Sequence, residues 1–207
     1  GTSVSGTPII WTDQSSPFIN QSTIQFSGGV GIKASLVDST FRVTNSLINQ
    51  STTTGIECSV DTNGKCEFLS NSITNNGYRG IDINDYINSS SNNTYVTISQ
   101  NIVSENVSRA VFLGLAKTTS VTNNTIANNG SGIVCDPYSC MNAGISLGTL
   151  TISNNVITGN ENDTLANGGW YTITGMYLKV EGNGSLIVEN NIIHNNVEHH
   201  GVGGALL

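Results

Sequence analysis

The sequence predicts an all-β fold, a right-handed parallel β-helix of about seven coils, and two observations carry that prediction. The first is an internal repeat in which an apolar residue, a polar pair, a second apolar residue, a polar turn and a Gly-apolar-x-apolar segment recur along the chain. The second is the composition of the 207 residues, of which only 10% are charged. Most of the polarity comes from Asn, Ser, Thr and Gly, which favour turns, whereas the abundant Ile and Val favour strands.

The repeat places the strands of each coil in order. Each copy starts at an apolar residue, has a second one five residues later, and then reaches a small residue before the next strand. Because alternate side chains of a strand point to the same side, these positions define one narrow interior that only a stack of coils can bury. The first position is Ile19, Val43, Phe68, Ile98, Val121, Ile152 and Val188, and the small residue is Gly31, Gly55, Gly80, Ala110, Gly132, Gly175 and Gly204.

An asparagine stands three residues after the first apolar position in five successive copies. Asn tolerates the left-handed backbone that a sharp corner needs, and its amide can donate to one neighbour and accept from another. We therefore expect a hydrogen-bonded ladder of Asn71, Asn101, Asn124, Asn155 and Asn191. Ser22 and Ser46 replace asparagine in the first two copies, which we expect to be less tightly registered.

The repeat covers almost the whole chain, so residues 1–207 are expected to form one domain, with residues 1–17 as an N-terminal edge or cap. The last residues, Gly203-Gly-Ala-Leu-Leu207, are a repeat strand with no capping sequence after it. Since exposed strand edges are normally covered, we expect either a piece of a longer stack or a subunit that pairs end to end with its neighbours.

Charge and cysteine usage limit the possible partners and the compartment. The net charge of −7 and scattered basic residues argue against nucleic acid, and no apolar run is long enough to span a membrane. The cysteines fall in two close pairs, which favours two disulfide-closed loops, Cys58 with Cys66 and Cys135 with Cys140, over metal ligation. Disulfides indicate an extracellular or cell-surface protein. The many Asn-x-Ser/Thr sequons suit glycosylation there.

These features resemble the right-handed parallel β-helix repeat proteins, a fold shared by pectate lyases, polygalacturonases, alginate epimerases and bacterial surface passengers. The resemblance covers roughly residues 18–207 and implies the fold, but this fold hosts both enzymes and passive adhesins. Phe68-Leu-Ser-Asn71 and Gly203-Gly-Ala-Leu206 also resemble, once each, the repeats of polymorphic membrane protein passengers of the autotransporter type.

The best catalytic candidates are charged residues that the repeat alignment stacks on one face. Arg79 and Arg109 occupy one position in adjacent coils, and Lys33, Glu57 and Asp82 occupy another. One carboxylate could act as acid or base while an arginine neutralises a uronate. The alternative, which we favour, is a surface ladder of ion pairs between coils.

Two weaker groups complete the candidates, and no cofactor is implied. His194, Glu198 and His200 could bind a metal, although a polar loop explains them better. Four aromatic residues in the longer loops could stack on sugars or simply anchor those loops: Tyr86, Tyr138, Trp170 and Tyr171.

The sequence therefore favours a non-catalytic exported β-helix that serves as adhesin, passenger or structural rod. Its expected partners are surface glycans or proteins of a host or neighbouring cell. One alternative is a lyase, hydrolase or epimerase acting on acidic polysaccharides, and another is the subunit of a head-to-tail extracellular filament.

Overall fold

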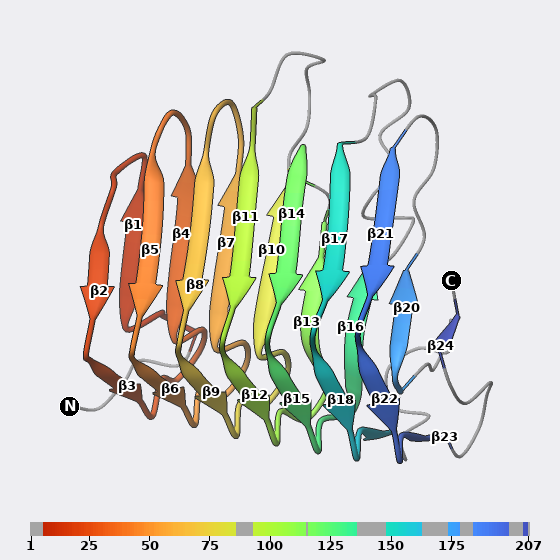
Figure 1. Ribbon diagram of the computed structural model, residues 1–207. Coiled ribbons are helices and arrows are strands. Elements are labelled where there is room, and N and C mark those ends of the chain that lie inside the picture. The colour runs from red at the N-terminus through yellow and green to blue at the C-terminus, as the bar shows by residue number, and fades with distance from the viewer. Residues whose placement is uncertain are drawn as a thin grey trace.

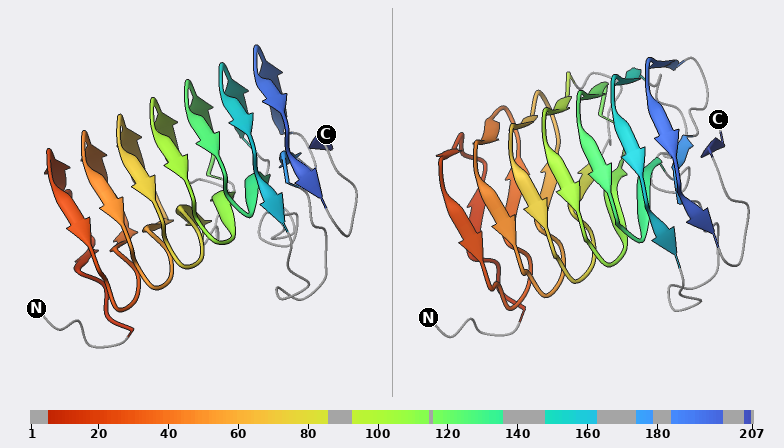
Figure 2. Two further views of the ribbon diagram at one scale, coloured as in Figure 1. Left: turned by 90° about the horizontal axis from the view of Figure 1, so that it is seen from below. Right: turned by 60° about the horizontal axis from the view of Figure 1, so that its bottom comes forward.

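The computed structural model describes residues 6–85, 93–114, 116–135, 148–162, 174–178, 184–198 and 205–206. These residues form three long parallel sheets whose strands alternate along the chain, so that each coil contributes one strand to every sheet. Figures 1 and 2 show the coils stacked side by side into a rod, with the first strand at one end and the last at the other. The parallel β-helix predicted from the repeat is confirmed, and the described residues contain no helix.

We call the sheets A, B and C. Sheet A has eight strands: β1 (Ile10–Asp13), β4 (Ile32–Leu36), β7 (Ile56–Val60), β10 (Ile81–Asp85), β13 (Arg109–Leu113), β16 (Ser131–Cys135), β20 (Met176–Leu178) and β24 (Ala205–Leu206). Sheet B has seven: β2 (Phe18–Asn20), β5 (Thr40–Thr44), β8 (Lys65–Leu69), β11 (Tyr95–Ser99), β14 (Thr118–Thr122), β17 (Thr149–Ser153) and β21 (Ser185–Glu189).

Sheet C also has seven strands, all short: β3 (Thr23–Gln25), β6 (Leu47–Asn49), β9 (Ser72–Thr74), β12 (Ile102–Ser104), β15 (Thr125–Ala127), β18 (Val156–Thr158) and β22 (Ile192–His194). A further two-stranded pair joins β19 (Glu161–Asn162) to β23 (Val197–Glu198). The seven strands in sheets B and C give the seven coils that the repeat predicts. The N-terminal segment contributes the additional strand β1, which pairs with β4.

The core is a set of inward rows, one residue per coil. The first apolar position of the repeat forms one such row in sheet B, where Val43 pairs with Phe68 and Phe68 with Ile98. These side chains are fully buried, and the rings of Phe41 and Phe68 meet edge to face with centroids 5.8 Å apart. The predicted disulfide between Cys58 and Cys66 is present, and it crosses this interior from sheet A to sheet B.

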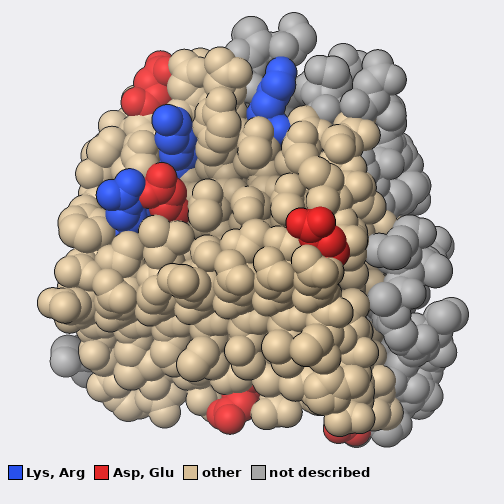
Figure 3. All heavy atoms as spheres, in the orientation of Figure 1, with Lys and Arg blue, Asp and Glu red and all other residues tan. Residues whose placement is uncertain are grey.

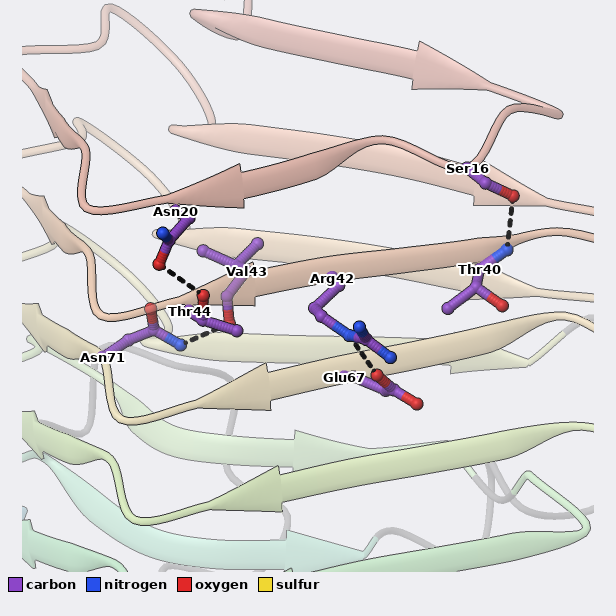
Figure 4. Close-up of polar contacts among 8 residues, drawn as sticks. All are labelled: Ser16, Asn20, Thr40, Arg42, Val43, Thr44, Glu67 and Asn71. Carbon is purple, nitrogen blue, oxygen red and sulfur yellow. Dashed lines mark hydrogen bonds and ion pairs between the residues drawn. The ribbon is translucent and has the colours of Figure 1, made fainter.

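The predicted asparagine ladder lies at the corner between sheets B and C. Asn124 is representative: its Nδ2 donates to Ile98 O at 3.0 Å and to Asn155 Oδ1 at 2.9 Å. Its Oδ1 accepts from the backbone N–H of Asn101 at 2.9 Å. Figure 4 shows the same contact to the preceding coil at Asn71, which donates to Val43 O. The ladder thus satisfies buried backbone groups of adjacent coils and ties their register together.

One detail of the ladder prediction is wrong. The left-handed backbone belongs to the residue before each ladder asparagine, for instance Gln100 (φ 59°) and Asn123 (φ 58°), while Asn101 and Asn124 have no positive φ. The preceding residue turns the chain and remains exposed, which leaves the ladder residue free to point its amide inward.

A second asparagine ladder, which the repeat alignment missed, lines the corner between sheets C and A. It contains Asn76, Asn106, Asn129, Asn160 and Asn196, each five residues after a member of the first ladder. This ladder explains the small residue of the repeat: a Cβ on Gly55 would lie 2.8 Å from both Asn76 Nδ2 and Gly80 O. Each coil therefore needs a small residue where the next coil passes closest.

Candidate functional site

The charged residues predicted to stack do lie on one outward row of sheet A. Lys33 pairs with Glu57, and Glu57 pairs with Asp82, in the register of β4, β7 and β10. The same row continues through Phe112, which pairs with Asp82. Arg79 stands just before β10, at the position that Arg109 occupies in the next coil. Sheet A therefore brings together all four residues of the candidate catalytic set, which we call the sheet A patch: Glu57, Asp82, Arg79 and Arg109.

Each carboxylate of the sheet A patch is already paired with a cation. Lys33 Nζ lies 2.6 Å from Glu57 Oε1, and Arg79 Nη1 lies 2.5 Å from Asp82 Oδ2. The Arg79 guanidinium carbon also lies 4.0 Å from the centroid of the Phe112 ring, and the Arg109 guanidinium carbon lies 4.9 Å from the same centroid. The arrangement is thus one ion pair between coils, Lys33–Glu57, and one within a coil, Arg79–Asp82. Both arginines also make cation–π contacts with Phe112.

The surroundings of Asp82 perturb its acidity. The residue is only 7% exposed, and its buried Oδ1 has no hydrogen-bond partner among the described residues. Burial raises the pKa of Asp82 above its ordinary value, although the positive charge of Arg79 opposes that effect. A buried carboxyl with a raised pKa can hold a proton, which is the property a general acid needs, but Oδ1 is closed to an incoming substrate.

The raised pKa makes a testable contribution to stability. The folded state binds the Asp82 proton more tightly than the unfolded chain, so this carboxyl favours folding below its ordinary pKa of 3.8. That contribution is lost as pH rises through the higher pKa of the folded state. We expect the stability of the wild type relative to Asp82→Asn to fall from about pH 3 to about pH 7, measured by urea unfolding. A stability difference that does not change with pH would contradict the burial of this carboxyl.

Several other predicted site residues lie outside the described residues. They are Tyr86, Tyr138, Trp170 and Tyr171 of the aromatic set, Cys140 of the second cysteine pair, and His200 of the metal set. Glu198 is described only as part of strand β23. His194 lies on β22, where its Nδ1 is 3.3 Å from Thr158 Oγ1 of the adjacent coil. No group of three metal-ligating side chains occurs within the described part of the chain.

Some asparagines of the glycosylation sequons are buried in the second ladder, whereas others are exposed. Asn106 and Asn129 are 1% and 2% exposed because their amides form the second ladder, so neither amide is open to an attached glycan in the folded chain. Asn20 and Asn123 are exposed at the other corner. Glycosylation stays a prediction, and among these four asparagines it is limited to the exposed Asn20 and Asn123.

A second surface, which the repeat alignment does not predict, lies on sheet B. On β11, β14 and β17 every outward position carries a hydroxyl group, whereas the positions between them point into the core. We call this surface the hydroxyl face, made up of Tyr95, Thr97, Ser99, Thr118, Ser120, Thr122, Thr149 and Thr151; Ser153, at the remaining position, is buried. The signal in the sequence is the alternation in Thr149-Leu-Thr-Ile-Ser153 and its counterparts.

Comparison with known proteins gives one match. A family model described as a right-handed beta helix region matches residues 38–206. Neither a curated protein nor a solved structure matches the chain. The matched range includes the sheet A patch, the hydroxyl face and all of both ladders.

Proposed function

This chain belongs to the right-handed β-helix family, and on that premise we propose that it is a rigid, non-catalytic rod of the cell exterior, of the adhesin or passenger type. The premise supplies the scaffold alone, because β-helices host both enzymes and binding proteins. The choice between an enzyme and a binding protein rests on whether the charged side chains of the sheet A patch are paired with one another. It also rests on the outward surfaces of the coils.

The observation that carries the proposal is that the candidate catalytic groups bind one another. Glu57 is held by Lys33 and Asp82 by Arg79, and the remaining oxygen of Asp82 is buried. A catalytic carboxylate must reach the proton that it transfers, either directly or through one water. The sheet A patch instead has the geometry of mutually neutralised surface charges, with one ion pair between coils and one within a coil.

The disulfide supports a role outside the cytoplasm. The Cys58–Cys66 disulfide is fully buried within the stack, and structural disulfides persist in oxidising compartments. Among the described residues, no helix has the length and apolar character needed to cross a membrane. The rigid sheets offer long flat surfaces for attachment, which suits an adhesin more than a filament built from end contacts.

The sheet A patch also favours a second candidate, an enzyme acting on acidic polysaccharides. Two guanidiniums converge on Phe112 beside a carboxyl whose pKa is raised. In that role Arg79 and Arg109 would hold a uronate carboxylate while Asp82 transfers the proton. The Arg79–Asp82 ion pair would have to open before a substrate could enter.

A turnover assay decides between these functions. Purified wild type and Asp82→Asn are incubated with polygalacturonate, alginate and neutral polysaccharides, and both new reducing ends and unsaturated uronates are measured. We expect no turnover by either protein above the level of a heat-denatured control. Turnover of any substrate by the wild type that Asp82→Asn abolishes would overturn the non-catalytic role and establish the second candidate.

A further inference from the structure

We propose that the hydroxyl face of sheet B is a binding surface for a neutral polysaccharide that lies along the rod axis. This inference rests on the proposed non-catalytic function and assigns to it a surface and a class of ligand. The surface is separate from the sheet A patch, because β11, β14 and β17 belong to a different sheet from β10 and β13.

The hydroxyl groups form a regular two-dimensional array. Strand register places Thr97 beside Ser120 and Ser120 beside Thr151. Rows on either side run from Tyr95 to Thr149 and from Ser99 to Ser153. Neighbours in a row are one strand spacing apart, about 4.8 Å, and successive rows are two residues apart, about 6.7 Å. The array therefore repeats along the rod axis on the scale of a single sugar ring.

The array carries no charge. No Lys, Arg, Asp or Glu occupies an outward position of β11, β14 or β17. The charged residues of sheet B lie on the flanking coils, where Arg42 pairs with Glu67 on one side and Glu189 ends β21 on the other. Figure 3 shows this face as largely uncharged, with a basic and an acidic side chain in contact toward the left and a separate acidic one toward the right. An acidic polymer would find no cluster of cations in the array, and a neutral one would meet no repulsion.

The hydroxyl groups remain available to a ligand. The structure describes one side-chain hydrogen bond within the face, from Thr122 Oγ1 to Ser99 Oγ at 3.1 Å. A hydroxyl can both donate and accept, as can the hydroxyls of a sugar, so each side of such an interface satisfies the other. A protein partner would instead favour an apolar or aromatic centre, which these Ser and Thr positions do not supply.

An aromatic ring stands at one corner of the array. Tyr95 is 41% exposed, and Lys65 Nζ lies 5.4 Å from the centroid of its ring. Lys65 thus lies over one face of the ring, and the exposed part of the ring offers apolar surface to the C–H face of a sugar. The exposed amides of Gln100, Asn123 and Asn154 extend the polar surface at the adjoining corner.

Affinity electrophoresis of the whole chain tests this inference, with laminarin, galactomannan and xylan as neutral probes and polygalacturonate as the acidic one. Ser120→Lys puts bulk and charge at the centre of the array. Ser72→Lys, an outward serine of sheet C, is the matched control. Tyr95→Ala is a second variant at an exposed position, and urea unfolding confirms that all three variants remain folded.

We expect at least one neutral probe to retard the wild type and Ser72→Lys equally, with affinity reduced about tenfold or more in Ser120→Lys and Tyr95→Ala. Retardation of Ser120→Lys equal to that of the wild type would overturn the assignment of the face. Retardation by polygalacturonate alone, or by no probe, would overturn the proposal that the face binds a neutral polysaccharide. The non-catalytic role would still be tested separately by the turnover assay. Thermal hysteresis without polysaccharide binding would also overturn the proposed polysaccharide surface and would indicate an ice-binding surface instead.

Discussion

Asn124→Gly is expected to lower the free energy of unfolding by about 4 kcal/mol. The change removes the acceptor of the Asn101 backbone N–H and the donor to Ile98 O, both in the buried ladder. It also removes one of the two donors to Asn155 Oδ1, which keeps the backbone N–H of residue 124. Each buried polar group left unsatisfied costs about 1–3 kcal/mol, and glycine adds about 0.5–1 kcal/mol of backbone entropy. Urea unfolding followed by circular dichroism measures the loss.

The matched control is Asn123→Gly, the same substitution one residue earlier. Asn123 is exposed, its φ is 58°, and glycine adopts that conformation readily. We expect its stability to stay within about 0.5 kcal/mol of the wild type. If the two variants unfold at the same urea concentration, the ladder does not stabilise the stack as we describe.

Phe68→Ala is expected to destabilise the stack by about 3–5 kcal/mol, the usual cost of emptying a buried aromatic site. Phe68 is fully buried between coils and packs edge to face on Phe41. Phe18→Ala, at a side chain 62% exposed, is the matched control and should cost less than about 1 kcal/mol. Thermal unfolding of the three proteins makes the comparison. Similar losses in both variants would mean that the interior rows do not supply the main stabilisation.

The register of the coils could be predicted because the repeated positions determine which residues pair. Aligning the first apolar position places Phe68 beside Ile98. Aligning the small residue of the repeat, Gly55 with Gly80, places Glu57 beside Asp82. Every residue of a strand is fixed once one of its positions is aligned, since paired parallel strands advance together. For this reason the first ladder and the composition of the sheet A patch were both accessible from sequence.

The second ladder was also within reach and was missed for a specific reason. Its residues, such as Asn106 and Asn129, fall in the polar turn of the repeat, where asparagine is common because of its turn chemistry alone. Only the structure shows that these side chains point inward and contact the next coil. The constant five-residue offset from Asn101 and Asn124 is the signal that could have revealed them.

The acidity of Asp82 could not be predicted from the repeat. Its outward position suggests exposure, but Arg79 and Phe112 cover it, and such covering depends on side-chain directions that strand alignment does not give. The hydroxyl face was missed because its rows appear only when all three outward positions of each strand are considered together. A single row, which contains Leu69 and Glu189 as well as Thr122, does not show it.

Hydrogen exchange of side-chain amides, followed by NMR in the folded chain, tests the central claim most directly: buried asparagine ladders hold the coils of this rod in register. We expect the Nδ2 protons of Asn101, Asn124 and Asn129 to exchange at least about a hundredfold more slowly than those of the exposed Asn123 and Asn154. Equal exchange rates in the two groups would contradict the ladders and the rigid scaffold built on them.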